Sequence, residues 1–389
     1  MTQKLWSRPF AIIMAINFML FLSFNMLNPS LPIYFQDIGI SETMTGVCIS
    51  IFTVGSIIVR PIAGGVLDRW GRRAVFFVSM LILIAMTFAY SLSSAILAIL
   101  LLRLIHGFDW GFASTATSTM ATDIIPRQKV GTGMGIFGLS MSLALAFAPA
   151  LAVELMDKTG FNGMIHVSTA FVAVATVLGL CYPFYRANHS PAVKNASSGK
   201  SELFEKTAVL PSIIMGCITL TMSAISTYVP LYALSMGMDN VGFFFTVYAL
   251  GLIVVRAFIG IVVDRFGIVA ATIPSFVSML AAMLLLAFAQ NLTMLLISGF
   301  LYGAGYGGAQ TTMQSLAVMN APQERFGAAN GTFFIGFDLG IGFGALLAGV
   351  LSDHFGFAPM YLMLSTFIIL AILLVLKFRP HKKSYLTTS

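Results

Sequence analysis

Charged residues are scarce in this chain: Asp, Glu, Lys and Arg together make up 9% of its 389 residues, while apolar residues make up 58%. A typical water-soluble domain carries about 25% charged residues, so a protein whose whole surface faces water is excluded. The mean hydropathy of +0.93 points the same way. We therefore expect an integral membrane protein.

Cysteine and the common catalytic motifs are also scarce. The three cysteines, Cys48, Cys181 and Cys217, lie in apolar segments without metal-ligand spacing, so we expect neither a disulfide nor a metal site. No glycine-rich loop ends in Gly-Lys-Ser or Gly-Lys-Thr, which argues against direct use of ATP. No nucleophile stands near a plausible base. The sequence predicts a protein that is not an enzyme, has no catalytic residues and needs no cofactor.

Long apolar runs, in contrast, recur along the whole chain. A bilayer is spanned by a helix of roughly 20 apolar residues. On this basis we predict an all-α integral membrane fold with about twelve transmembrane helices. The predicted spans are residues 10–33, 44–66, 74–92, 95–122, 132–155, 163–185, 208–234, 239–262, 268–289, 292–319, 327–350 and 357–378.

The chain also repeats itself at an offset of 196 residues. The offset aligns Arg60, Gly64, Asp68, Arg69 and Gly71 with Arg256, Gly260, Asp264, Arg265 and Gly267, and it also aligns Gly107 with Gly303 and Gly160 with Gly356. We therefore predict two six-helix bundles, at residues 1–185 and 208–389. A polar cytoplasmic linker at residues 186–207 joins them, and the second bundle ends in a short cytoplasmic tail.

The basic residues are distributed unevenly among the predicted loops. With the amino terminus inside, nearly all loop lysines and arginines fall on the cytoplasmic side, and only Lys158 lies outside. This pattern predicts a multi-pass protein of the cell (plasma or inner) membrane with both termini cytoplasmic. The net charge of +7 then reflects the basic residues that orient the protein in the membrane, and it does not indicate a surface that binds nucleic acid.

Two repeated six-helix halves with a long cytoplasmic connection resemble the plan of the major facilitator superfamily. The segment from Gly64 to Arg73 is similar to the signature loop between helices 2 and 3 of that family. The resemblance implies that this loop gates the cytoplasmic face, and it assigns the gating role to Gly64, Asp68, Arg69, Gly71, Arg72, Arg73, Asp264 and Arg265. We expect Asp68 to face the helix start at Gly327–Gly331, because amide groups there attract a carboxylate. The alternative is that the arginines only mark the inner face.

The predicted fourth helix carries a polar trio, Arg103, His106 and Asp109, at three-residue steps. The stretch resembles the helix 4 motif of the family, which is built around a membrane-embedded arginine. Ionisable residues at this depth are costly and are functional candidates by default. Asp109 is the first choice for proton coupling. The alternative is a static pair between Arg103 and Asp109 that only fixes helix packing.

Small residues in helix 5 are spaced as in the exporters of the family, although Ala144 and Ala148 stand where glycines are usual. The resemblance implies antiport; generic close packing is the alternative. The predicted helix-packing residues are Gly135, Pro149, Gly331, Gly340 and Gly344.

The end of helix 1, from Asn28 to Tyr34, resembles the drug:proton antiporter families. Such exporters often carry an acid in helix 1, whereas this chain offers only Asn17, Asn25 and Asn28. The second candidates for proton coupling are therefore Asp338 and Glu154.

Polar and aromatic stripes in the predicted spans 10–33, 208–234 and 292–319 predict the lining of a substrate cavity. The predicted lining residues are Asn17, Phe21, Asn25, Asn28, Tyr228, Tyr232, Tyr302, Tyr306 and Gln310. Amides and aromatic faces with little charge suit an amphipathic or weakly polar small molecule. The alternative is that these aromatic side chains pack between helices.

These features predict a secondary transporter that exports a small amphipathic molecule in exchange for protons by alternating access. Its partners would be the substrate, protons and the lipid bilayer, without ATP or nucleic acid. Two alternatives stay open: an importer or facilitator of a small polar solute, and a non-transporting membrane sensor or lipid-handling protein on the same scaffold.

Overall fold

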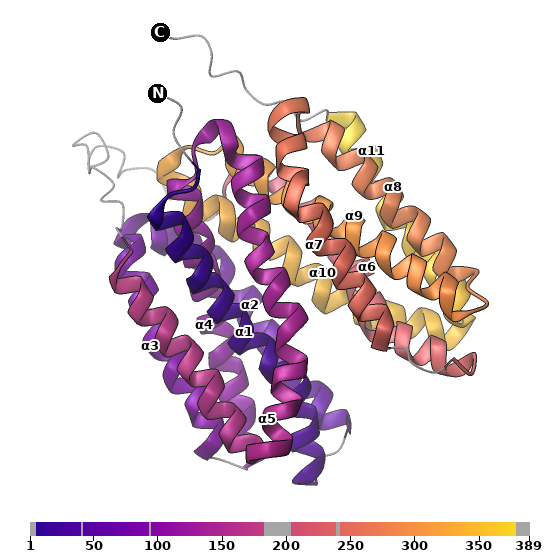
Figure 1. Ribbon diagram of the computed structural model, residues 1–389, viewed down its shortest axis with the longest axis horizontal. Helices are drawn as coiled ribbons and strands as arrows, with labels where there is room; N and C mark the ends of the chain where they lie inside the picture. Colours follow the sequence, from indigo (N-terminus) through magenta and orange to yellow (C-terminus); the bar gives the residue numbers. More distant parts are fainter. Residues whose placement is uncertain (1–4, 40–41, 93–94, 183–203, 239–241, 379–389) are drawn as a thin grey trace. The chain divides into compact units, whose positions relative to one another are not determined.

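The computed structural model describes residues 5–39, 42–92, 95–182, 204–238 and 242–378, and every regular element within these ranges is helical (Figure 1). The long helices are α1 (Arg8–Asp37), α2 (Glu42–Trp70), α3 (Arg72–Ala89), α4 (Ile96–Ile124), α5 (Val130–Leu180), α6 (Lys206–Ser235), α7 (Gly242–Phe266), α8 (Ile268–Ala287), α9 (Leu292–Met319), α10 (Phe326–Phe355) and α11 (Phe357–Phe378). Short 3-10 turns lie at Tyr90–Leu92, Arg127–Lys129 and Gln323–Arg325.

Helix α5 contains two of the predicted spans. It has 51 residues and breaks at Gly160, where φ is 70°. At 1.5 Å per residue it would be about 75 Å long if straight, far more than one bilayer thickness. Within the described ranges, 11 helices, α5 among them, are long and apolar enough to cross a membrane. The predicted all-α fold with about twelve spans is confirmed.

The internal repeat extends to the backbone conformation. Gly71 and Gly267 have φ values of 89° and 88°, and each separates two helices, α2 from α3 and α7 from α8. Gly160 and Gly356, with φ values of 70° and 80°, are matched in the same way. This left-handed region is open to glycine at little cost. The repeated glycines therefore set the same helix boundaries in both halves.

The chain forms two compact units. Unit 1 contains residues Met1–Ile125, Leu143–Glu205 and Pro322–Thr332, and unit 2 contains Pro126–Ser142, Lys206–Ala321 and Phe333–Ser389. The beginning of α5 thus belongs to unit 2 and the beginning of α10 to unit 1, at matching places in the repeat. The predicted boundaries at 186–207 stay a prediction, and most of that linker lies outside the described residues.

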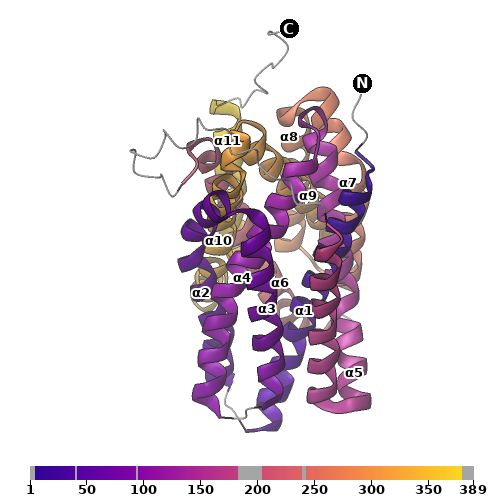
Figure 2. The same ribbon diagram turned by 90° about the vertical axis from the view of Figure 1, so that its left-hand side faces the viewer.

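Each unit is built around one central helix. In unit 1, α4 packs against α1, α2 and α3, as Figure 2 shows from the side. In unit 2, α9 holds the matching position against α6, α7 and α8. Glycines allow the closest approaches: a Cβ at Gly55 would fall 2.5 Å from the carbonyl oxygen of Leu104, and the matched Gly251 meets Phe300 in the same way.

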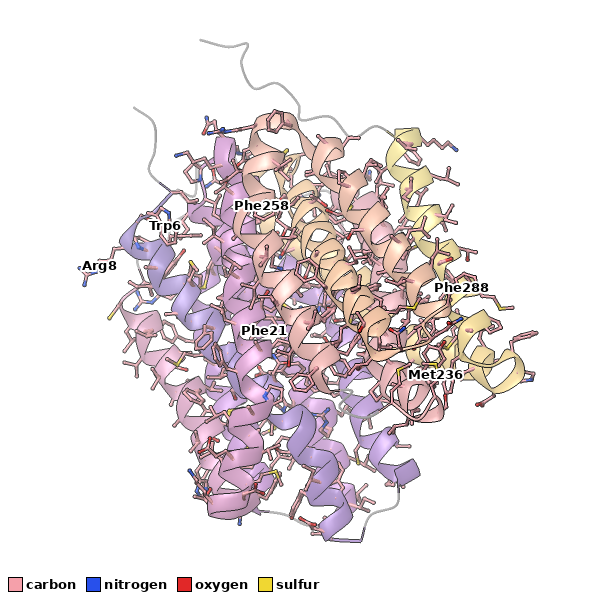
Figure 3. The ribbon with its side chains drawn as sticks, turned by 45° about the vertical axis from the view of Figure 1, so that its right-hand side comes forward. Trp6, Arg8, Phe21, Met236, Phe258 and Phe288 are labelled. Atoms are coloured by element: carbon pink, nitrogen blue, oxygen red, sulfur yellow. The ribbon has the colours of Figure 1, made fainter. Side chains whose placement is uncertain are left out.

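Large apolar side chains cover the outer faces of both units. Trp6 is 65% exposed, Phe258 48% and Phe288 62% (Figure 3). Soluble monomers rarely expose so many large apolar side chains, whereas lipid chains solvate them well. Together with the membrane-crossing helices, this surface identifies a multi-pass membrane protein.

Candidate functional site

Asp68 lies in the last turn of α2, within unit 1, and binds the beginning of α10. Its Oδ1 accepts a hydrogen bond from the amide of Gly327 at 3.0 Å, and its Oδ2 accepts one from the amide of Ala328 at 2.9 Å. The first amides of a helix have no partner within the helix and carry partial positive charge. The contact expected between Asp68 and the helix start at Gly327–Gly331 is therefore present; the gating role stays a prediction.

Asp264 makes the matching contact within unit 2. Its Oδ1 accepts from the amide of Gly131 at 2.9 Å, and its Oδ2 accepts from the amide of Thr132 at 2.8 Å and from the Thr132 hydroxyl at 2.5 Å. Gly131 and Thr132 begin α5 as Gly327 and Ala328 begin α10. The two halves therefore use one recognition geometry twice.

Arg72 joins two carboxylates of unit 1. Its guanidinium lies 3.2 Å from Asp68 and 3.0 Å from Asp123 at the end of α4, and it also donates to the carbonyl of Leu67. Sequence reasoning missed Asp123, because no local pattern connects the end of α4 with the start of α3. The other predicted gating arginines, Arg69, Arg73 and Arg265, have exposed side chains.

Sequence reasoning also left unassigned two buried arginines that begin the repeated motif. Arg60 is 2% exposed and donates from Nη1 to the Ser114 hydroxyl at 2.7 Å and to the Thr115 hydroxyl at 2.9 Å. Arg256 is equally buried, and its partners belong to α5 and α9. Both arginines fall in the middle of an apolar run at matched positions, and that was the available signal.

The polar trio of α4 does not form a relay within the described chain. Asp109 is 4% exposed, forms no ion pair there, and leaves its Oδ2 without a hydrogen-bond partner. Its neighbour Trp110 stacks on Phe24, with ring centroids 4.1 Å apart. Asp109 is therefore a buried acid whose charge no described cation balances.

Arg103 and His106 have partners on other helices. Arg103 donates from Nε to the carbonyl of Cys48 at 3.0 Å and places its guanidinium 4.7 Å from the centre of the Phe52 ring. His106 Nδ1 lies 3.3 Å from the Tyr90 hydroxyl. The alternative of a static pair between Arg103 and Asp109 is therefore wrong. A step of six residues places the two side chains on different faces of α4.

The other acid candidates lie in different settings. Glu154 is exposed and pairs with Lys158 at 2.6 Å, four residues along α5. Asp338 of α10 is 7% exposed. Their roles in proton coupling stay predictions, and burial favours Asp338 over Glu154.

The predicted cavity residues of unit 1 are mostly enclosed. Asn17 is 2% exposed, and Asn25 is 7% exposed and donates to the carbonyl of Phe21 at 2.8 Å. Phe21 meets Trp110 edge to face at 5.1 Å. The side chain of Asn28 lies outside the described residues. Trp110, which the predicted stripes did not include, is the aromatic residue that joins this face of α1 to α4.

The predicted cavity residues of unit 2 separate into two groups. Tyr302 and Tyr306 stack on one face of α9, with centroids 6.4 Å apart, and Gln310 follows one turn later. Tyr228 donates to the carbonyl of Ala345 at 3.3 Å. Tyr232 packs on Phe357 and Tyr361 of α11, with centroids 5.6 Å apart in both cases. For Tyr232 the structure therefore shows helix packing.

Four of the predicted packing residues lie at helix crossings. A Cβ at Gly135 would fall 3.2 Å from the carbonyl oxygen of Arg256, and one at Gly331 would fall 3.0 Å from that of Arg60. Gly340 and Gly344 of α10 meet the backbone of α6. Pro149 lies inside α5.

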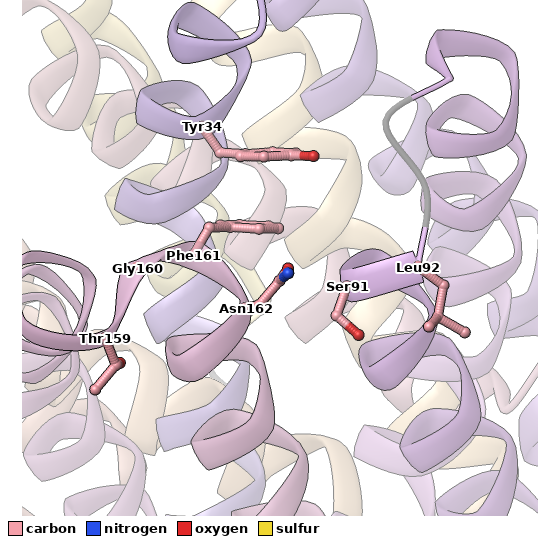
Figure 4. A pocket seen from close by; sticks show the side chains of 7 residues that line it. All are labelled: Tyr34, Ser91, Leu92, Thr159, Gly160, Phe161 and Asn162. Carbon is pink, nitrogen blue, oxygen red and sulfur yellow. The ribbon is translucent and has the colours of Figure 1, made fainter.

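A pocket of about 390 Å³ opens in unit 1 beside the break at Gly160 (Figure 4). The rings of Tyr34 and Phe161 stack 3.8 Å apart along one side, and Asn162 and Ser91 supply polar groups. The described residues that line it carry no carboxylate, amino, guanidinium or imidazole group. Within the described residues no cluster of His, Cys, Asp or Glu is suited to a metal ion.

Comparisons with known proteins agree on one family. The family model of the Major Facilitator Superfamily matches residues 13–244 and 238–389. The staphylopine export protein of Staphylococcus aureus is 24% identical over 96% of both chains. A homologue of the multidrug resistance efflux pump PmrA from Lactococcus lactis is 25% identical over 90% of both chains.

Solved structures show the same fold. The human organic anion transporter MFSD10 has a TM-score of 0.79 at 17% identity and covers 95% of this chain and 99% of its own. The Escherichia coli fucose:proton symporter FucP has a TM-score of 0.79 at 18% identity and covers 95% of this chain and 98% of its own. With its repeated helices and a family match over nearly its whole length, the chain belongs to the Major Facilitator Superfamily of membrane transporters.

Proposed function

We propose that this transporter exports a small amphipathic molecule in exchange for protons. Asp109 is the observation that carries the proposal, because it is a buried carboxyl on the central helix of unit 1 with an unpartnered oxygen. A buried carboxylate without a partner is unfavourable. Such a group is stable with a proton bound and needs water or a cation once the proton leaves. Because water or a cation can reach Asp109 only when the surrounding helices open, loss of its proton is coupled to that opening.

Two further observations support export. The relatives named above include an export protein and an efflux pump homologue. Trp110, the residue after Asp109, packs on Phe21 and Phe24 of α1, and α9 carries Tyr302, Tyr306 and Gln310. Such aromatic and amide groups suit an amphipathic molecule. In this proposal the contacts of Asp68 and Asp264 close one side of the transport path and separate when the opposite state forms. The protein would lie in the inner membrane with both termini cytoplasmic.

The experiment is proton flux in liposomes that hold the purified protein and a pH-sensitive dye inside. An inward-acid gradient is imposed, and a panel of cationic, neutral and anionic amphipathic compounds is screened. At least one compound should dissipate the gradient with the wild-type protein, and Asp109→Asn should lower this flux more than tenfold while the compound still binds. If no compound moves protons but one still exchanges in radiolabelled counterflow, the protein is a facilitator. A protein that binds compounds without exchange is a sensor.

Import is the second candidate. Solved structures that share the fold include the fucose:proton symporter FucP, so the fold alone does not set the direction. The same liposomes separate the two: an antiporter acidifies or alkalises the lumen in the sense opposite to a symporter for a given substrate gradient.

A further inference from the structure

Arg256 is a buried cation without a carboxylate partner. It lies near the middle of α7 and is 2% exposed. Its Nη1 donates to the carbonyl of Gly138 and, at 2.6 Å, to the Ser142 hydroxyl, and its Nη2 donates to Oε1 of Gln310. In the described chain it forms no ion pair. The positive charge is therefore solvated by three neutral oxygens, and no anion balances it.

The site also contains donors that have no acceptor. Arg256 Nε and the Tyr306 hydroxyl are both buried without a hydrogen-bond partner. Tyr306 precedes Gln310, the partner of Arg256 Nη2, by one turn of α9. Buried polar groups are rarely left unpaired in this way. The site therefore offers one guanidinium donor and one hydroxyl donor for which it supplies no acceptor.

Two of the three acceptors of Arg256 come from the beginning of α5. Gly138 makes the contact possible, because a Cβ there would lie only 3.2 Å from Nη1 and 3.4 Å from Cζ of Arg256. The guanidinium thus lies against the α5 backbone, and Asp264 holds the first amides of the same helix. If α5 moves off α7 during transport, Arg256 keeps only Gln310. A buried cation that loses its acceptors is strongly destabilised unless another anion or acceptor replaces them.

The repeat shows what kind of group is missing. The offset that aligns Arg256 with Arg60 aligns Ser142 with Asp338. One half therefore has a carboxylate at this register, and the other half has a hydroxyl. The site around Arg256 therefore has a hydroxyl where the repeat has a carboxylate, and a negative charge there would have to come from a bound molecule.

We propose that Arg256, Gln310 and Tyr306 form an anion-binding subsite and that the transported molecule is an organic anion with a carboxylate and an apolar body. The inference rests on the proposed function as a transporter. Both oxygens of the carboxylate contact the guanidinium, because the planar, forked donors of arginine match a carboxylate better than a one-atom anion. The stacked rings of Tyr302 and Tyr306, which are 1% and 3% exposed, follow the subsite along α9 and contact the apolar body once the site opens. The oxygens of Gly138 and Ser142 take the place of the carboxylate when α5 lies on α7.

The test is binding of matched acids and amides to the full-length protein in lipid nanodiscs. The probes are benzoate, 2-naphthoate and indole-3-acetate, each beside its neutral carboxamide, and binding is measured by calorimetry and thermal shift. At least one acid should bind at least tenfold more tightly than its amide. Arg256→Gln should weaken the acid by about 10- to 100-fold, the range expected for charged hydrogen bonds, and leave the amide unchanged.

The decisive variants are Ser142→Asp and Ser142→Asn, which are equal in size and differ in charge. Ser142→Asp places an internal carboxylate where the wild-type Ser142 hydroxyl lies 2.6 Å from Nη1 of Arg256. This variant should abolish binding of the acid. Ser142→Asn should retain binding within about threefold of the wild type, because it adds no charge. Equal loss in both variants, or no preference for any acid over its amide, overturns the proposal. Since Ser142→Asn and Ser142→Asp are compared with each other, a folding defect of Arg256→Gln does not decide the result.

The outcome is distinguishable from that of the proposed function. If cationic or neutral compounds drive proton flux and acids do not bind, proton-coupled export stands and the anion subsite is wrong. If acids bind through Arg256 but move without protons, the anion subsite stands and proton antiport is wrong.

Discussion

Asp68 and Asp264 lie 196 residues apart in the sequence and make the same contact. Each carboxylate accepts hydrogen bonds from two successive amides at the beginning of a helix, between 2.8 and 3.0 Å. A carboxylate is one of the few side chains that can satisfy two unpaired helix amides and their partial positive charge together. Both halves of the repeat therefore contain the same contact between a carboxylate and a helix start, and in each half the two partners lie more than 100 residues apart in the sequence.

Replacement of either aspartate with asparagine should weaken that contact. An amide group brings one acceptor and an NH₂ that opposes a helix amide, so each variant loses charged hydrogen bonds of about 1.5–3 kcal/mol. We expect Asp264→Asn to lower the thermal unfolding temperature and to change the transport rate at least threefold in liposomes. Asp157→Asn, an exposed acid of α5, is the control. Wild-type stability and transport in Asp264→Asn would show that the contact has no role in the cycle.

Asp109 should show the opposite relation between stability and activity. Its Oδ2 is buried without a partner, so the carboxyl contributes little to folding. Asp109→Asn should leave the unfolding temperature unchanged or raise it, while it removes substrate-driven proton flux. The two readouts are thermal unfolding in detergent and the liposome pH assay. If Asp109→Asn unfolds the protein, the carboxyl is a structural group and not the proton carrier.

The fold could be predicted from the sequence because the bilayer restricts it. Backbone groups in lipid must be satisfied within helices, so apolar runs of the right length translate directly into spans. The matched glycines Gly71 and Gly267 then fix the same helix boundaries in both halves. The contact of Asp68 with the start of α10 could also be expected, since helix amides attract any nearby carboxylate.

The site could be predicted only in part because its contacts come from other helices. The spacing of Arg103 and Asp109 on one helix indicated a shared site, but Arg103 instead meets Cys48 and Phe52 of α2. Tyr232 continued a polar and aromatic pattern, yet it packs against α11. A pattern along one helix reports which face a residue occupies, and it does not report which neighbour covers that face.

Gly64 and Gly65 offer a matched test of close packing. A Cβ at Gly64 would fall 2.6 Å from the carbonyl oxygen of Gly327 and 2.8 Å from Cα of Ala328, whereas a Cβ at Gly65 would meet nothing within 4 Å. Backbone atoms cannot move aside as a flexible side chain can. Gly64→Ala should cost about 1–3 kcal/mol, and Gly65→Ala should be neutral or stabilising by up to about 1 kcal/mol, because alanine favours a helix. Thermal unfolding of both variants checks the difference, and equal behaviour would contradict the contact with α10.

Arg72 should be the most sensitive of the basic residues at this end of unit 1. It lies within 3.2 Å of both Asp68 and Asp123, and the Asp123 side chain is 6% exposed. Arg72→Gln leaves two carboxylates close together with their shared cation removed, and loss of one partner from a largely buried pair costs about 3–5 kcal/mol. Arg69→Gln changes an exposed neighbour and should change stability by less than about 0.5 kcal/mol.

Asp123→Asn added to Arg72→Gln should restore part of the lost stability, because it removes one of the two carboxylate charges that Arg72 no longer balances. If the double variant is no more stable than Arg72→Gln alone, repulsion between the carboxylates is not the cause, and the loss comes from the hydrogen bonds of Arg72 to the carbonyl groups of Leu67 and Gln323.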